Sequence, residues 1–320
     1  MKTLKLLFGS MLMATLLVSC VAEVIIEEPF IDEPITLAEL LDSHELWYVN
    51  INQTTGNGEV PFLQKAFTVS FNFGTLFANN NLVGLGSQGN GYGIDVGYYD
   101  TRGMVLQVDH DIDGYWALEV SQLGFNRIRL YHRPTNTAYF LTGYQRGNFD
   151  YDFVFYDNIH YFLQEYVAWE KTYVSEEGAL NDFDAENFLR FLAGGSDDTF
   201  ESSEDQVGTP ISQLYWDYIG YYSVFDVNGD PYLKTLTLDY DELGNDYFEL
   251  IVIDDSTIEL YHPNSGTTYE FTGRGYIQYL KGAAGKGQVE KKRKKIINKK
   301  MNIERKSAPK KMKIESKKTS

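Results

Sequence analysis

Residues 127–143 read RIRLYHRPTNTAYFLTG, and residues 257–273 repeat the pattern as TIELYHPNSGTTYEFTG, offset by 130 positions. In both segments, runs of β-branched, aromatic and aliphatic residues flank a short turn that contains proline. This pattern predicts two antiparallel strands joined by a turn, present twice in one chain. An internal duplication therefore decides how the rest of the sequence is divided.

Earlier landmarks recur in the same order. The tripeptide Gly-Tyr-Tyr at 97–99 returns at 220–222, and Trp47 returns as Trp169, at offsets of 123 and 122. Because the offset changes only slightly between landmarks, we infer that loops have drifted while the elements between them were kept. The duplicated unit is a short helix followed by about 100 residues.

Each copy predicts eight short strands that follow a short apolar helix. The helices are expected at 36–41 and 159–163. The strands are expected at 47–51, 65–71, 74–79, 92–99, 104–109, 115–120, 127–131 and 137–142 in the first copy, and at 168–174, 186–192, 199–203, 215–225, 235–240, 247–252, 256–261 and 267–272 in the second. Eight sequential strands suit a closed meander barrel, which leaves no exposed edge. The predicted fold is mainly β, with two tandem antiparallel eight-stranded barrels.

Each copy resembles a lipocalin-like domain, in which a helix precedes an eight-stranded barrel whose first strand carries a tryptophan, here Trp47 and Trp169. Over about residues 36–278 the chain resembles Bacteroidota-type lipoproteins with duplicated lipocalin-like domains. The lipocalin Gly-x-Trp motif is not kept, since Glu45 and Val167 stand two positions before the tryptophans. Similar lipoproteins are sometimes named nicotinic acid mononucleotide adenylyltransferase, but the His-x-Gly-His motif of that enzyme class is absent here.

The N-terminus is typical of a targeting segment. Lys2 and Lys5 precede a largely apolar run over 6–18, which is too short to span a bilayer as a helix. The Leu-Val-Ser-Cys sequence ending at Cys20 resembles a lipobox, which implies that Cys20 is lipidated and becomes the new N-terminus. The alternative is an ordinary signal peptide with a chance cysteine. Because Cys20 is the only cysteine, the chain can form no internal disulfide and no Cys-based zinc cluster.

Composition divides the chain into five parts. We expect a signal peptide at 1–19, a linker at 20–35, a lipocalin-like barrel at 36–145, a helix plus a second lipocalin-like barrel at 146–278, and a basic tail at 279–320. The lipid anchor implies attachment to the cell outer membrane, on either its periplasmic or its surface face.

The tail differs sharply in charge from the rest of the chain, whose total net charge is -17. Residues 281–320 hold 16 Lys and Arg against three Asp and Glu, which leaves 12 against 42 in the 280 residues before them. A segment this charged and this poor in apolar residues is expected to be disordered. Its predicted partners are anionic lipid or the acidic body, with a solvated tail as the alternative. Nucleic acid is the least expected partner, because the anchor places the chain outside the cytoplasm.

Four aromatic side chains are candidates for ligand binding. Trp47 and Trp169 open the two barrels, and His132 and His262 end equivalent strands near a barrel mouth. Tyrosine and tryptophan faces suit a small ligand or a glycan, and an eight-stranded barrel holds at most one small molecule. Alternatively, the aromatic residues fill the barrel interiors and each histidine bonds the turn that follows it.

One group of acidic residues is a candidate calcium site. Asp109, Asp111 and Asp113 match the start of a calcium loop, D-x-D-x-D-G. The twelfth position is Val120 instead of glutamate, and a strand pattern follows where a helix is required. The alternative is a hairpin with Asp113 and Gly114 in its turn.

The sequence favours binding or structure over catalysis. No serine or cysteine nucleophile has a matching base, no His-Glu-x-x-His spacing occurs, and no cofactor is predicted. The first hypothesis is a lipid-anchored envelope protein that binds a small ligand or glycan. The second is a structural or interaction protein with filled barrels. A hydrolase with paired carboxylates is the third, although no spacing supports it.

Overall fold

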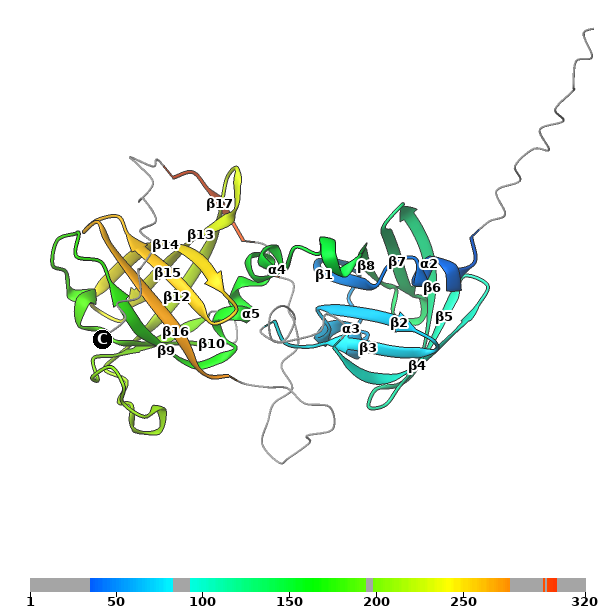
Figure 1. Ribbon diagram of the computed structural model, residues 1–320, viewed down its shortest axis with the longest axis horizontal. Helices are drawn as coiled ribbons and strands as arrows, with labels where there is room; N and C mark the ends of the chain where they lie inside the picture. The colour runs from blue at the N-terminus through cyan, green and yellow to red at the C-terminus, as the bar shows by residue number, and fades with distance from the viewer. Residues whose placement is uncertain (1–34, 83–92, 194–197, 277–295, 297, 304–320) are drawn as a thin grey trace, which may run out of the picture. The chain divides into compact units, whose positions relative to one another are not determined.

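The computed structural model describes residues 35–82, 93–193, 198–276, 296 and 298–303, so Cys20 and the predicted signal peptide lie outside the described residues. Two closed barrels, each of eight antiparallel strands, follow one another along the chain, which confirms the predicted fold (Figure 1). Among the described residues, no helix has the length and apolar character needed to cross a membrane.

Barrel 1 is a meander in which every strand pairs with its neighbour in sequence and β1 pairs with β8 to close the sheet. Its elements are α2 (Leu37–Asp42), β1 (Leu46–Thr55), α3 (Pro61–Lys65), β2 (Thr68–Asn72), β3 (Thr75–Asn79), β4 (Ile94–Arg102), β5 (Val105–His110), β6 (Gly114–Gly124), β7 (Arg127–His132) and β8 (Thr137–Tyr144). The strand expected at 65–71 begins only at Thr68. Pro61 starts α3 just before it, because proline is favoured in the first helical turn.

Barrel 2 has the same order of strands, from β9 to β16. Its first strand β9 pairs with its last strand β16, and the pairing of β11 with β12 completes the ring. Its elements are α4 (Tyr151–Asp157), α5 (Ile159–Leu163), β9 (Tyr166–Val174), a 3-10 helix η4 (Asp182–Ala185), β10 (Phe188–Leu192), β11 (Thr199–Ser203), β12 (Tyr218–Val227), β13 (Asp230–Tyr240), β14 (Gly244–Asp254), β15 (Thr257–His262) and β16 (Thr267–Tyr276). Helix α5 confirms the helix predicted at 159–163. Helix α4 was not predicted. Its N-cap is Asp150, whose carboxylate accepts the backbone N–H of Phe153 at 2.9 Å.

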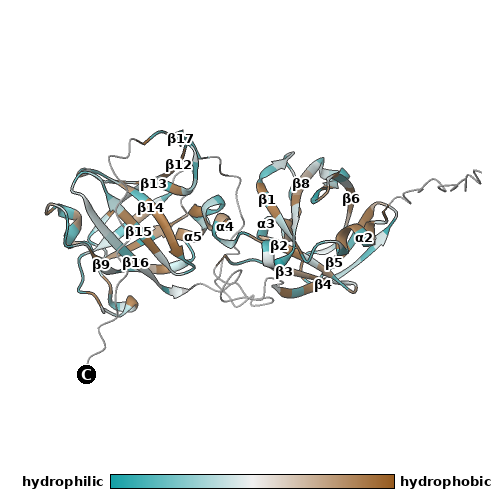
Figure 2. Ribbon diagram, turned by 45° about the horizontal axis from the view of Figure 1, so that its top comes forward, coloured by the Kyte–Doolittle hydropathy of each residue, from teal (hydrophilic) through white to brown (hydrophobic). Residues whose placement is uncertain are grey.

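One end of each barrel is filled by a tryptophan beneath the helix that precedes it. Trp47 and Trp169 are fully buried. The indole N–H of Trp47 donates to the carbonyl of Leu41 at 3.0 Å, and that of Trp169 donates to the carbonyl of Leu163 at 2.8 Å. These two helices, α2 and α5, are largely hydrophobic (Figure 2). The bonds satisfy the ends of α2 and α5 and fix each helix over its barrel.

A short helix follows the first strand of each barrel and covers the other end of that barrel; we call it the plug. In barrel 1, α3 buries Phe62 and Leu63, and the backbone N–H of Val60 donates to the hydroxyl of Tyr139 at 3.0 Å. In barrel 2, η4 buries Phe183, and the hydroxyl of Tyr269 donates to Asp184 at 2.6 Å. Buried side chains thus occupy the interiors of both barrels, and a short helix lies at each end.

The repeated Gly-Tyr-Tyr motif is explained in part by close strand contact. A Cβ at Gly97 or Gly220 would overlap the backbone carbonyl oxygen of the facing strand, at Asp109 or Asp239. The last tyrosine of each motif, Tyr99 or Tyr222, turns toward the core. The middle tyrosines, Tyr98 and Tyr221, face outward and are exposed.

Replacing Gly220 with alanine is therefore expected to destabilise the protein by about 1 to 3 kcal/mol, because a backbone carbonyl cannot move aside as a flexible side chain can. Chemical denaturation would measure the change. Gly124→Ala is the matched control, since a Cβ there meets nothing within 4 Å. Equal stability of the two variants would contradict the proposed overlap.

Part of the basic tail pairs with barrel 2. Strand β11 is shorter than β12, so the second half of β12 has an open edge. Strand β17 (Lys300–Met301) covers part of that edge in parallel orientation, and the N–H groups of Asp226 and Asn228 donate to the carbonyls of Lys299 and Met301, each at 3.0 Å. The tail predicted to be disordered over 279–320 therefore contains a short strand, because edge pairing orders residues whose composition alone predicts no structure.

Candidate functional site

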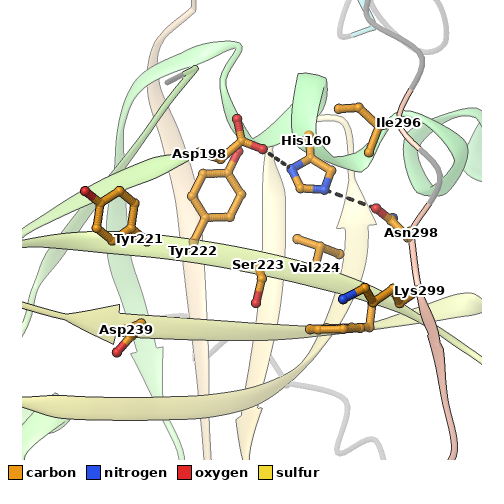
Figure 3. A pocket seen from close by; sticks show the side chains of 11 residues that line it. His160, Asp198, Tyr221, Tyr222, Ser223, Val224, Asp239, Ile296, Asn298 and Lys299 are labelled. Atoms are coloured by element: carbon orange, nitrogen blue, oxygen red, sulfur yellow. Dashed lines mark hydrogen bonds and ion pairs between the residues drawn. The ribbon is translucent and has the colours of Figure 1, made fainter. Parts of the chain in front are cut away.

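A groove of about 600 Å³ lies at the open edge of β12 in barrel 2, where residues 223–225 pair with neither β11 nor β17 (Figure 3). It is lined by side chains from α5, from the residue just before β11, from β12 and β13, and from the tail: His160, Asp198, Tyr221, Tyr222, Ser223, Val224, Phe225, Asp239, Ile296, Asn298 and Lys299. The groove exists because β11 is too short to cover the whole edge of β12.

A histidine joins the helix, the barrel and the tail at one end of the groove. The Nδ1 atom of His160 lies 2.8 Å from a carboxylate oxygen of Asp198, and its Nε2 lies 3.2 Å from the amide oxygen of Asn298 (Figure 3). The imidazole also packs against the ring of Tyr222, with 5.5 Å between centroids. These contacts hold the tail as one wall of the groove.

The phenol of Tyr221 and the carboxylate of Asp239 form the other end. The two residues face each other across β12 and β13 and both point outward. Tyr221 is 51% exposed, and within the described part of the chain no hydrogen bond or ion pair holds either side chain. An exposed aromatic face beside an exposed carboxylate can pack on an apolar surface and accept hydrogen bonds from hydroxyl groups.

Among the residues that the structure describes, the groove has an acid–base pair, and the hydroxyl of Ser223 is not aimed at it. His160 and Asp198 have the pairing that general bases use. The hydroxyl of Ser223, however, is directed away from His160 in Figure 3. The arrangement therefore suits ligand binding better than acyl transfer.

The predicted ligand-binding residues lie elsewhere. Trp47 and Trp169 belong to the packed barrel interiors and have no solvent-exposed surface. His132 places Nδ1 2.8 Å from the hydroxyl of Thr135, and His262 places Nδ1 2.8 Å from that of Ser265. Each histidine therefore bonds the turn after its strand, the alternative that the sequence leaves open. Burial also lowers the pKa of His262.

The acidic pattern forms a hairpin turn. Strands β5 and β6 pair from Val105 to His110, and His110 faces Gly114 across the turn. The carboxylate of Asp113 lies 3.6 Å from the ammonium of Lys65 and 3.4 Å from the Nδ1 atom of His110. Within the described ranges, Asp109, Asp111 and Asp113 make no cluster that could hold a metal ion.

A second polar cluster lies inside barrel 2. Burial raises the pKa of Glu186 to about 7, although the hydroxyl of Tyr240 donates to its carboxylate at 2.8 Å. Burial lowers the pKa of Lys171 to about 8, and its ammonium donates to the carbonyls of Phe183 and Asp184 at 3.2 and 3.0 Å. Both groups are enclosed by the plug, so we assign them to the interior of the barrel and not to the groove.

The residues of the groove are not among the candidates that the sequence predicts. Helix α5, the start of β11, β12, β13 and the tail are far apart in the sequence, and no local spacing joins them. One signal was present: the middle tyrosine of Gly-Tyr-Tyr recurs in both copies. No family model matches the chain, and no curated protein matches it significantly. The function must therefore be argued from the chain's own residues.

Proposed function

We propose that this chain is a lipid-anchored protein of the cell envelope that binds a sugar of a glycan chain in the groove on barrel 2. The observation that carries the proposal is the exposed phenol of Tyr221 beside the exposed carboxylate of Asp239. Sugars present apolar C–H faces and a rim of hydroxyl groups. An aromatic face packs on the former, and a carboxylate accepts hydrogen bonds from the latter.

The charges in the groove favour a neutral ligand. Among the described lining residues, Asp198 and Asp239 bring two carboxylates, of which Asp198 faces His160, and Lys299 brings one ammonium. An anionic ligand would meet the carboxylate of Asp239 directly, at a cost in electrostatic energy. Ser223 and Asn298 add neutral hydroxyl and amide groups to the lining. Tyr221, Tyr222 and Phe225 bring aromatic rings to the same lining, and aromatic rings with a few placed polar groups are typical of a small-ligand site.

The filled barrels support a site on the wall and not in the lumen. Tryptophans and plugs occupy the interiors, so a ligand entering either barrel would have to displace buried side chains. Binding in a barrel would therefore lose the packing energy of these side chains, whereas binding in the groove displaces no buried side chain.

Attachment through a lipidated Cys20 completes the proposal. Each buried CH₂ of an acyl chain contributes about 0.8 kcal/mol, so several chains would hold the protein at the outer membrane without a spanning helix. The basic residues of the tail would add attraction to anionic lipid headgroups.

A structural or interaction role is the second candidate, and the filled interiors favour it specifically. Barrels packed with side chains are rigid bodies that present surfaces to a partner protein. Under this alternative, the exposed tyrosines contact a protein and bind no sugar.

A glycan array separates the two candidates. The detergent-solubilised full chain would be applied to neutral oligosaccharides of glucose, mannose, galactose and xylose. We expect saturable binding to at least one of them, weakened about tenfold by Tyr221→Ala or Asp239→Asn, which corresponds to about 1.4 kcal/mol for a lost aromatic or charge-assisted contact. Tyr215→Ala, an exposed tyrosine outside the groove, should bind like the unmodified chain. Absence of saturable binding to every oligosaccharide would contradict the proposal and leave the structural role.

A further inference from the structure

A transverse row of four residues recurs on the outer faces of both barrels. Each row crosses four neighbouring strands, and its members face one another in register. The row in barrel 1 is Thr75, Tyr98, Asp109 and Tyr115, and the row in barrel 2 is Thr199, Tyr221, Asp239 and Asn245. Three of the four positions keep the same residue type, so the duplication has preserved a Thr-Tyr-Asp row on the surface.

Packing does not account for the row in barrel 1. Tyr98 and Tyr115 are 64% and 62% exposed, and Asp109 is exposed between them. In the described ranges, no hydrogen bond or ion pair engages these three side chains. By contrast, close strand contact explains Gly97 and the core explains Tyr99. The exposed tyrosine is thus the one residue of the repeated motif that the fold does not require.

We infer that Tyr98, Asp109 and Tyr115 form a second sugar-binding site, on the wall of barrel 1. The inference rests on the proposed function, because the ligand class is taken from the equivalent Tyr221 and Asp239 in the groove of barrel 2. Tyr115 replaces Asn245 of the second row, so this site has an aromatic residue on each side of its carboxylate.

The spacing of the strands indicates how long a ligand must be to contact both tyrosines. Adjacent strands lie about 4.8 Å apart, so the backbones that carry Tyr98 and Tyr115 are separated by roughly 10 Å. Two consecutive sugars of a neutral glycan have a similar length. One sugar packs on each phenol face, and hydroxyl groups near their linkage donate to Asp109. A neutral glycan is favoured over an acidic one, since Asp109 is the only charged member of the row.

Stoichiometry tests the inference. Isothermal titration would use the full chain in detergent and the neutral tetrasaccharide that binds most tightly on the array. We expect two sites per chain in the unmodified protein. Tyr221→Ala should retain one of them at its original affinity, with affinity at the other weakened about tenfold. The combined variant Tyr98→Ala/Tyr115→Ala should also retain one site, with affinity at the other weakened by at least tenfold.

Two controls keep the result interpretable. Phe125→Ala removes another exposed aromatic side chain of barrel 1 and should leave two sites. Melting temperatures of all variants should match that of the unmodified chain, since the replaced side chains are exposed. A single site per chain, weakened by Tyr221→Ala and unchanged by Tyr98→Ala/Tyr115→Ala, would overturn this inference while the proposed function stands. No binding by the unmodified chain would overturn both.

Discussion

Replacing Trp169 with alanine is expected to lower the free energy of unfolding by about 3 to 5 kcal/mol. The indole is fully buried in barrel 2, packs edge-on against Phe162 and Tyr166, and donates to the carbonyl of Leu163. Its removal leaves a cavity and an unpaired carbonyl at the end of α5. Chemical denaturation followed by circular dichroism would measure the loss.

A second tryptophan in the same barrel is the matched control. Trp216 is partly exposed and lies under the guanidinium of Arg190, 4.4 Å from the ring centroid. Trp216→Ala should cost about 1 kcal/mol, the magnitude of a cation–π contact near the surface. If Trp169→Ala were no more destabilising than Trp216→Ala, the indole of Trp169 would line an open lumen, and the account of filled barrels would be wrong.

Replacing Glu186 with glutamine is expected to flatten the dependence of stability on pH between about 4.5 and 7. Burial raises the pKa of Glu186 in the folded protein to about 7, above the ordinary value of 4.5. In this window the folded state keeps a proton that the unfolded state has lost. The stability that this group contributes is fully present below pH 4.5 and is lost as the pH rises through 7. The loss is about 3 kcal/mol.

The difference between two unfolding profiles isolates this effect. The free energy of unfolding would be measured from pH 4.5 to 7.5 for the unmodified chain and for Glu186→Gln, in which the amide oxygen still accepts from Tyr240. Lys171 does not interfere, because its lowered pKa of about 8 acts at higher pH. Glu177→Gln, at an exposed position, should reproduce the profile of the unmodified chain. Parallel profiles for all three proteins would show that the carboxyl of Glu186 is charged and solvated in the fold.

The barrels were predictable because their signals are local and repeated. The segments at 127–143 and 257–273 became β7–β8 and β15–β16, with Leu130 facing Tyr139 and Leu260 facing Tyr269. Alternation and turn residues sufficed there, since neighbouring strands in a meander are also neighbours in sequence. The helices before Trp47 and Trp169 were expected from the short apolar stretch that precedes each tryptophan.

The plugs, α4 and the tail strand depend on contacts that no local pattern records. Helix α3 has only five residues, and its place is fixed by the burial of Phe62 and Leu63. Strand β17 exists because β11 leaves the edge of β12 open, which cannot be read from the composition of a lysine-rich tail. The groove also exists because β11 is shorter than β12. Its residues His160, Asp198 and Asn298 are therefore joined by tertiary structure alone.

Fluorine NMR on the chain labelled with fluorotryptophan tests the central claim, which is that sugars bind the outer walls of filled barrels. The chain has four tryptophans, so Trp47 and Trp169 can be assigned by single replacement with phenylalanine. At saturation with the bound tetrasaccharide, the account predicts that the resonances of both buried indoles keep their positions and line widths. A shift or broadening at Trp47 or Trp169 on saturation would place the ligand inside a barrel and contradict it.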